Sequence, residues 1–347
     1  MKHRTKRIAA FALSAALLIA PYFYVQNKND SSSASSTNTF TETSSTMSSS
    51  ATSAQNSNST NPQSAVDTSP SSESISAIVP VPVQTGAQME SLWFYYNMLD
   101  SSQKAAYLEL YDAIQTWIRN DSVTQPFTYE LKNPGATVNG DDLLTDIKWD
   151  NPIVAQYFNT VTVKEANGST IFTDTDDQYT FGNTQDVHQL IHATEAAADS
   201  ILSGLTSSMS DYDKYWYIAK KLCEETVFDY AFPQVSMRQF LDDSGAYGAL
   251  VNHLSVCQGF AQAYDFLCKR AGLFSLVVSG STSTGDHAWN IIKLDDGYYH
   301  VDTTWMQSNE TRYFCLTDKQ IAIDHTMISA YHPDCDGSHY AYQGSLS

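Results

Sequence analysis

Cys257, His287 and Asp302 occur in this order in the last third of the chain, and their side chains are of the three types that cooperate in covalent catalysis. A thiol attacks as its thiolate, a histidine accepts and returns the proton, and a carboxylate fixes the tautomer and orientation of the histidine. We therefore interpret Cys257 as a candidate nucleophile, His287 as its general base and Asp302 as the orienting carboxylate. This set predicts nucleophilic catalysis through a covalent intermediate.

A helix is expected to begin near Cys257, because apolar residues follow at helical spacing and Gly272 is the kind of residue that typically ends a helix. The unpaired N–H groups and the dipole at a helix N-terminus favour the anionic form of a thiol placed there. Cys268 lies further along the same helix, about 16 Å away by helical rise, which is too far for a disulfide with Cys257; we interpret it as a core residue. Beyond the helix, an apolar strand is expected over Leu276–Val278 and a polar loop over Ser279–Asp286.

Two further strands are expected to carry the histidine and the carboxylate. The strand signals cover 287–294 and 298–305, and Asp295-Asp296-Gly297 between them is a strong hairpin signal. Opposite residues on neighbouring strands point to the same face of a sheet. The spacing of His287 and Asp302 about the turn can therefore bring their side chains together.

The segments around these residues resemble the three signature segments of the bacterial transglutaminase-like superfamily. They are Ser255–Ala261, His287–Asn290 and Tyr299–Trp305, and weaker similarity to exported members extends to Asp150–Pro152, Phe228–Tyr230 and Tyr313–Asp318. The resemblance implies a papain-like α+β core in which the nucleophile helix packs on an antiparallel β-sheet. It also implies acyl transfer through a thioester, with the three candidates above as the catalytic residues. The acceptor stays open, because the superfamily includes crosslinking enzymes, peptidases and amidases.

Two other histidines compete with His287 for the role of the base. His253 precedes Cys257 by only four residues and is expected on the approach to the helix. His300 can share a strand face with Asp302, but it lacks the His-Ala-Trp-Asn context of His287. We expect His300 to face solvent.

The remaining residues that could do chemistry are expected to be structural. Trp289 and Trp305 are interpreted as packing residues that flank the site. Cys223 and Cys315 are expected in the core, and Cys335, in a turn-rich tail, is expected to be the most exposed thiol; any disulfide pairing among the cysteines stays open. No zinc-site spacing or phosphate-binding loop occurs, so we expect neither a metal nor a cofactor. The histidines without such spacing are His188, His192, His325, His332 and His339.

Residues 1–28 are expected to be a signal anchor or a signal peptide. A basic cluster over residues 2–7 precedes an uncharged apolar run from Ile8 to Val25, about 27 Å long as a helix. The run ends without the small-residue pattern of a cleavage site, and its aromatic residues suit a membrane interface, so we prefer the uncleaved anchor. In either form the body is expected outside the cytoplasm, attached to the cell membrane or secreted.

The rest of the chain is expected to consist of a linker and two folded parts. Residues 29–85, rich in Ser, Thr and Asn, predict a disordered linker. Residues 86–210 predict a mostly helical α+β extension, and residues 211–347 predict the transglutaminase-like core. The elements expected in the first 130 residues after the linker are a helix capped by Ser101-Ser102, strands over 127–129 and 160–163, a helix over Asp186–Leu205 and a helix capped by Asp211.

The composition argues against nucleic acid as a partner. The formal net charge is −19, and five of the 19 basic residues lie in the first 28, which leaves 14 basic against 38 acidic residues. So acidic a body repels nucleic acid phosphates.

Two functions of different classes are compatible with these observations. The first is an extracytoplasmic cysteine enzyme that acts on a carboxamide or peptide carbonyl, with protein or peptide substrates, cell-wall peptide among them. The second is a non-catalytic surface module on the same fold that binds protein or cell-wall polymer. The complete set of thiol, imidazole and carboxylate favours the enzyme.

Overall fold

The structure is a computed structural model that describes residues 91–135, 137–175, 183–232, 235–308, 311–329 and 331–344. The predicted signal anchor and the predicted linker both lie outside these residues. Among the helices of the described part, none combines the length and the apolar character needed to cross a bilayer.

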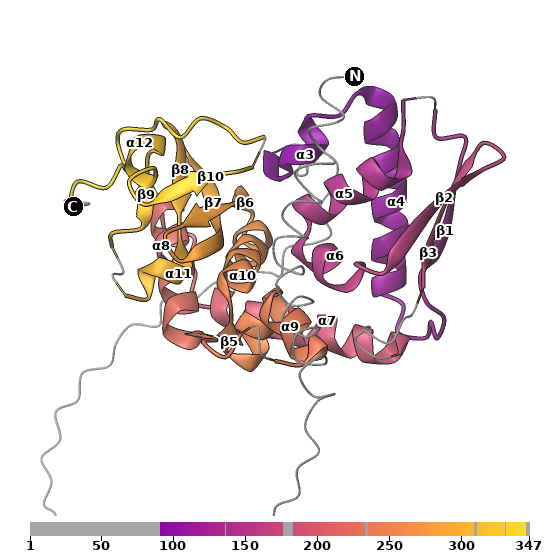
Figure 1. Cartoon of the computed structure of the whole chain (residues 1–347), viewed down its shortest axis with the longest axis horizontal. Coiled ribbons are helices and arrows are strands. Elements are labelled where there is room, and N and C mark those ends of the chain that lie inside the picture. The colour runs from indigo at the N-terminus through magenta and orange to yellow at the C-terminus, as the bar shows by residue number, and fades with distance from the viewer. Residues whose placement is uncertain are drawn as a thin grey trace, which may run out of the picture.

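The first half of the described chain is mostly helical, with a small sheet at its outer edge (Figure 1). Its elements are α3 (Phe94–Asn97), α4 (Ser101–Ile118), β1 (Thr128–Lys132), α5 (Gly140–Asp150), α6 (Pro152–Tyr157), β2 (Val161–Ala166), β3 (Ser169–Asp174) and α7 (Thr184–Leu202). The three strands pair antiparallel in the order β1-β3-β2. The sequence predicted α4, α7 and parts of β1 and β2, but it missed α3, α5, α6 and β3; of these, α3 and α6 are too short to show a clear periodicity.

Two helix starts differ by one residue from the prediction. Asp100 caps α4, because its carboxylate accepts the N–H groups of Ser102 and Gln103 while the Gln103 side chain returns to the Asp100 N–H. Ser210 caps α8 (Asp211–Glu225) in the same reciprocal way with Asp213. Both are capping boxes, in which the residue one position earlier satisfies the exposed N–H groups.

The second half forms an α+β core. Its elements are α8 (Asp211–Glu225), β4 (Val227–Phe228), α9 (Met237–Asp243), the π-helical turn η1 (Gly248–Asn252), β5 (Leu254–Ser255), α10 (Cys257–Arg270), β6 (Ser275–Thr282), β7 (Gly285–Leu294), β8 (Gly297–Val301), α11 (Thr303–Met306), β9 (Phe314–Leu316), α12 (Asp318–Ile321) and β10 (His325–Met327). Five strands form an antiparallel sheet in the order β10-β6-β7-β8-β9. Helix α10 packs against β6 and β7. The predicted arrangement of a helix on an antiparallel sheet is confirmed.

The strand limits correct two predictions. The segment predicted as a polar loop over 279–286 is mostly strand, since β6 and β7 pair up to Thr282 opposite Gly285 and leave only a two-residue turn. The last strand of the hairpin ends at Val301 and does not reach Trp305, because Asp302 caps the short helix α11. The Asp295-Asp296 turn itself is as predicted, with Leu294 opposite Gly297.

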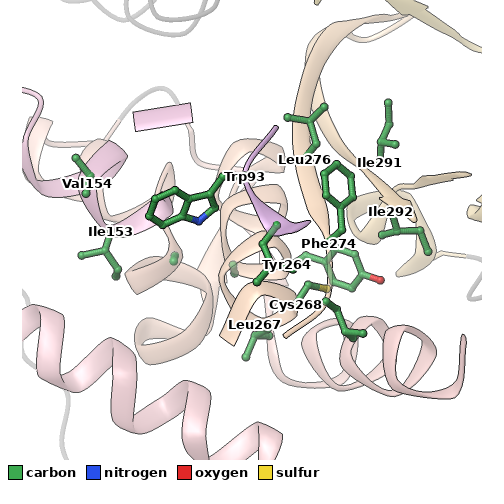
Figure 2. Close-up of a cluster of buried hydrophobic side chains, with 14 of the residues drawn as sticks. Trp93, Ile153, Val154, Tyr264, Leu267, Cys268, Phe274, Leu276, Ile291 and Ile292 are labelled. Atoms are coloured by element: carbon green, nitrogen blue, oxygen red, sulfur yellow. The ribbon is translucent and has the colours of Figure 1, made fainter. Parts of the chain in front are cut away.

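One continuous apolar core joins the two halves through α10. Figure 2 shows Ile153 and Val154 of α6 and Trp93 on one side of this helix, and Leu276 and Ile291 of the sheet on the other. Tyr264, Leu267 and Cys268 of α10 lie between them and are fully buried, as expected for Cys268. The helix that begins at the candidate nucleophile is therefore held on both sides.

A buried cation also joins the C-terminal end of α10 to the helical half. Lys269 Nζ lies 2.8 Å from Asp265 Oδ2 and 2.7 Å from the carbonyl oxygen of Asp150. The Asp150 carboxylate in turn accepts the N–H groups of Tyr95 and Tyr96, both within α3. This network ties α3 and α5 to α10.

Replacing Lys269 by Ala should lower the free energy of unfolding by about 3–5 kcal/mol, because it leaves the fully buried Asp265 carboxylate without its cation. Lys220→Ala is the matched control, since Lys220 forms an exposed ion pair with Glu224 on α8 and its loss should cost less than about 1 kcal/mol. Urea unfolding of the two variants measures the difference. Equal costs would show that the buried network does not hold α10.

Candidate active site

Cys257 is the first residue of α10 and is buried, with 8% of its surface exposed. Val256 occupies the N-cap position, and no side chain of the described residues caps this helix. A valine cannot accept hydrogen bonds from the first turn. The N–H groups of that turn are therefore uncapped at the end of the helix where the thiol lies.

Close backbone packing fixes the approach to Cys257. Ser255 Oγ donates to the carbonyl oxygen of Asp243 at 2.6 Å, and the Val256 N–H donates to the same oxygen at 3.1 Å. A Cβ atom at position 259 would collide with this carbonyl and with Ser255 Oγ. Gly259 is thus required for the first turn of α10 to lie against the end of α9.

His287 lies in β7 and contacts both of the other candidates. Its Nε2 atom is 2.8 Å from Asp302 Oδ2, and Cys257 lies close enough to help raise the pKa of its ring. Because Nε2 faces the carboxylate, Nδ1 is the ring nitrogen that remains for the sulfur. The structure thus brings together the three side chains singled out in the sequence, in the order thiol, imidazole, carboxylate.

The register of the β7–β8 hairpin explains this meeting. Asn290 pairs with Val301, which places position 302 opposite Trp289. His287 lies two residues from Trp289 on the same strand and the same face. It therefore meets Asp302 diagonally and not directly across the strands.

Asp302 has no exposed surface and accepts hydrogen bonds at both carboxylate oxygens. Oδ1 accepts the N–H groups of Thr304 at 3.0 Å and Trp305 at 3.2 Å, which caps α11. Oδ2 faces His287 Nε2 and, at 3.1 Å, His325 Nε2. Four donors thus surround one buried carboxylate.

The charges of this group support one another. Burial raises the pKa of Asp302, but the charge of His287 and the hydrogen bonds from His287 and His325 outweigh it and hold that pKa well below its usual range. Burial lowers the pKa of His287, but the charge of Asp302 and its hydrogen bond outweigh it and raise that pKa, with a further contribution from Cys257. The carboxylate is therefore ionised and the imidazole holds its proton at neutral pH.

His325 is a residue of the site that the sequence did not predict. It is 23 residues beyond Asp302 and has no spacing with a cysteine or a carboxylate that indicates chemistry. It reaches Asp302 only because β10, at one edge of the sheet, comes close to the end of β8, which lies three strands away in the sheet order. Such curling of a sheet leaves no local signal in the sequence.

Aromatic rings surround the two histidines. The Trp289 ring lies 5.9 Å from the His287 ring at an interplanar angle of 21°, and Trp305 lies at the same distance on a tilted plane. Both tryptophans also contact His325, at 5.0 and 4.6 Å. Their packing role agrees with the prediction, and the rings exclude water around the charged groups, which strengthens the electrostatic contacts there.

Comparison with known proteins is consistent with this geometry. Residues 197–303, from within α7 to the start of α11, match the family model described as the transglutaminase-like superfamily, and the match includes all three candidates. The chain carries a transglutaminase-like core. Members of this superfamily are typically cysteine-dependent enzymes of acyl transfer or peptide hydrolysis.

Two similar proteins cover parts of the chain. Kyphoscoliosis peptidase of Homo sapiens is 27% identical over 132 residues, which are 33% of this chain and 20% of that protein. The chain thus spans about a fifth of the length of this relative. The crystal structure of a TGase has 17% sequence identity and a TM-score of 0.31, and the likeness covers 42% of this chain and 43% of that one.

The prediction that His300, the rival base, faces solvent was wrong. It is fully buried in the transglutaminase-like core, where Trp289 Nε1 donates to its Nδ1 at 3.0 Å and its Nε2 lies 2.9 Å from Asp318 Oδ1. Burial lowers the pKa of His300, which favours the neutral ring. Both ring nitrogens of His300 already have hydrogen-bond partners. His300 therefore positions Trp289 and is not available as a base for Cys257. His253, the other rival, is exposed at the end of η1.

The other cysteines of the core differ from Cys257 in their surroundings. Cys335 is 1% exposed, so the prediction that it is the most exposed thiol was wrong; its N–H and C=O bond to Asp318, which draws the tail inward. Burial raises the pKa of Cys268, Cys315 and Cys335, and each therefore resists ionisation. Cys223 is half-buried. All five cysteines are described, and none of them forms a disulfide.

Two groups of described side chains bring potential metal ligands close together. They are His287 with Asp302 and His325, and His300 with Asp318 and Cys335. Hydrogen bonds already engage the ligand atoms of both groups: His300 Nε2 pairs with Asp318 Oδ1, and Cys335 Sγ donates to the carbonyl oxygen of Pro333 at 3.8 Å. In the first, two Nε2 atoms share one oxygen of Asp302; in the second, His300 accepts from Trp289 at Nδ1, so Nε2 keeps the proton that a metal would have to replace. Hydrogen bonding accounts for both groups without an ion.

A cavity of about 290 Å³ lies away from the three candidates. Lys269 and Arg270 line it with residues of the helical half, such as Trp93 and Ile153. These two basic residues end α10, and Cys257 begins it, about 18–20 Å away along the helix axis. This cavity therefore belongs to the junction of the two halves and not to the candidate active site.

Asp302→Asn should lower the pKa of His287, because burial, which disfavours the imidazolium, would no longer be opposed by a carboxylate. The pH titration of the His287 ring signals by NMR measures this shift. Asp121→Asn is the matched control: Asp121 raises the pKa of His192 in the same way but lies in the helical half, so this variant should change the titration of His192 and of the neighbouring His188 but not that of His287. An unchanged His287 titration in Asp302→Asn would contradict the proposed pairing.

Proposed function

We propose that the chain is a cysteine enzyme that cleaves a carboxamide or peptide bond and forms a thioester on Cys257. The observation that carries the proposal is the placement of Cys257 at the N-terminal end of a buried helix, next to His287, which in turn pairs with Asp302. A thiol at a helix N-terminus beside an imidazolium is the arrangement that stabilises a thiolate nucleophile. The family match supports the same reaction class.

The residues divide the reaction between them. The Cys257 thiolate forms a C–S bond with the carbonyl carbon, and the C–N bond breaks as His287 gives its proton to the leaving amine. Water or a second amine then attacks the thioester; His287 takes up the proton of this nucleophile and the thiolate leaves. Asp302 keeps the ring in place throughout and compensates its positive charge.

The start of α10 is placed to stabilise the oxyanion of each tetrahedral intermediate. The backbone N–H of Cys257 belongs to the uncapped first turn, beside the atom that attacks. N–H groups fixed in this way act on developing negative charge without further rearrangement. We propose this N–H as one oxyanion donor.

The substrate class follows from the reaction. A thioester enzyme of this kind takes the side-chain amide of a protein or peptide, or a peptide bond itself, and cell-wall peptides contain such bonds. The name of the human relative contains peptidase, which supports the hydrolytic form of the reaction as one of the two outcomes. The rival proposal, a binding module on this fold, would not require the thiol, imidazole and carboxylate to meet.

Iodoacetamide at mildly acidic pH should label Cys257 ahead of the other four cysteines, because the neighbouring imidazolium and the helix N-terminus stabilise its thiolate. His287→Ala should remove most of this preference, and Asp302→Ala should weaken it less, since that residue does not contact the sulfur. Peptide mapping by mass spectrometry measures the labelled fraction at each site.

Cys223 is the most stringent internal control in this experiment, because it is half-buried and thus more accessible to the reagent than Cys268, Cys315 and Cys335. Labelling of Cys223 should be slow in all variants. Equal labelling of Cys223 and Cys257, unaffected by His287→Ala, would reject the catalytic assignment and favour the binding module.

A further inference from the structure

Two histidines contact the same oxygen of Asp302. His287 Nε2 lies 2.8 Å from Asp302 Oδ2 and His325 Nε2 lies 3.1 Å from it, while the two imidazole rings are 5.2 Å apart. A catalytic carboxylate that only oriented His287 would need one such contact. The second histidine therefore requires an explanation of its own.

The other side of His325 is also held by a carboxylate. Its Nδ1 atom is 2.6 Å from Asp324 Oδ1, and the Tyr313 hydroxyl donates to Asp324 Oδ2 at 2.8 Å. Arg312 approaches the same carboxylate at 3.7 Å. The contacts run from His287 through Asp302, His325 and Asp324 to a partly exposed arginine, so basic and acidic groups alternate along the series.

The hydrogen bonds determine which atoms of His325 carry protons. An ionised carboxylate accepts hydrogen bonds and cannot donate them. With a carboxylate at each ring nitrogen, His325 satisfies both contacts only with both nitrogens protonated. In that form it gives Asp302 Oδ2 a charge-assisted donor, which is stronger and more directional than a neutral one.

The surrounding structure holds this ring rigidly. The His325 side chain has no exposed surface and lies against Trp289, Trp305 and Tyr313. A Cβ atom at Gly280 would collide with the Trp289 ring and with the backbone of β10. The glycine thus lets Trp289 and β10 pack closely, which brings His325 over the site.

We propose that His325 is a positioning residue, which holds Asp302 Oδ2 in the direction that keeps His287 aimed at Cys257. The backbone donors from α11 fix the other oxygen of this carboxylate, and His325 fixes the oxygen that contacts the base. This inference rests on the proposed function. Asp324 acts one step further out, by setting the orientation of the His325 ring.

The test compares the rate of alkylation of Cys257 by iodoacetamide at one mildly acidic pH in four proteins, a readout that needs no known substrate. His325→Leu should react about tenfold more slowly than wild type, which corresponds to the loss of one hydrogen bond to a charged group. His325→Gln retains an N–H group of similar reach and should stay within about threefold of wild type. His188→Leu is the matched control, because His188 is equally buried, against Trp117 in the helical half; it should leave the rate unchanged.

The direction of the change in alkylation rate distinguishes a positioning role of His325 from a purely electrostatic one. Removing a positive ring next to His287 would by itself favour the imidazolium of His287 and speed alkylation. An unchanged or faster rate in His325→Leu would therefore overturn the inference. If that variant does not fold, Asp324→Ala decides in its place, since Asp324 is partly exposed; a slower rate supports positioning and an unchanged rate rejects it.

The same experiment distinguishes the two proposals. If Cys257 of the wild type is no more reactive than Cys223, the proposed function fails. If Cys257 is selectively reactive in the wild type and in His325→Leu alike, the function stands and the role of His325 is rejected.

Discussion

A carboxylate without solvent exposure costs several kcal/mol to bury and is tolerated only where donors surround it. Asp302 meets this requirement through two backbone N–H groups of α11 and the Nε2 atoms of two histidines. These donors come from three separate elements, β7, α11 and β10. The anion can therefore be stable only in the folded arrangement that also presents His287 to Cys257, so that a single electrostatic constraint couples the folding of the sheet to the geometry of the site.

The rest of the core supplies the framework around that carboxylate. Helix α10 is packed on the sheet on one side and on the helical half on the other, and Gly259 lets its first turn lie against the end of α9. The thiol thus lies at one end of a helix that is packed on two sides. Trp289 and Trp305 pack against the ring of His287. The pair of His300 and Asp318 in turn holds Trp289 in place. The polar groups of the site are consequently rigid and shielded from water.

Local patterns were sufficient to predict the helix that begins at Cys257, the Asp295-Asp296 turn and the shared face of His287 and Asp302. Each depends on residues that are close in sequence, where capping, turn chemistry and strand alternation apply. His325 could not be predicted, because its contact with Asp302 depends on how far the whole sheet curls. Cys335 was placed wrongly for a related reason: its turn-rich surroundings are typical of exposed loops, but its N–H donates to the Asp318 carboxylate and its carbonyl oxygen accepts the Asp318 N–H, which holds it in the interior. Contacts between residues that are far apart in the sequence leave no periodic pattern from which they could be predicted.

The formation of a thioester on Cys257 tests the central claim most directly. A small activated ester such as p-nitrophenyl acetate acylates an activated thiolate whatever its natural substrate, and intact-mass analysis followed by peptide mapping locates the acetyl group. We predict one acetyl group on Cys257 of the wild-type protein, removable by hydroxylamine, with much slower formation in His287→Ala and none at this site in Cys257→Ala. Acetylation that is spread over other residues, or that proceeds equally fast in His287→Ala, would contradict the assignment of Cys257 as a nucleophile activated by His287.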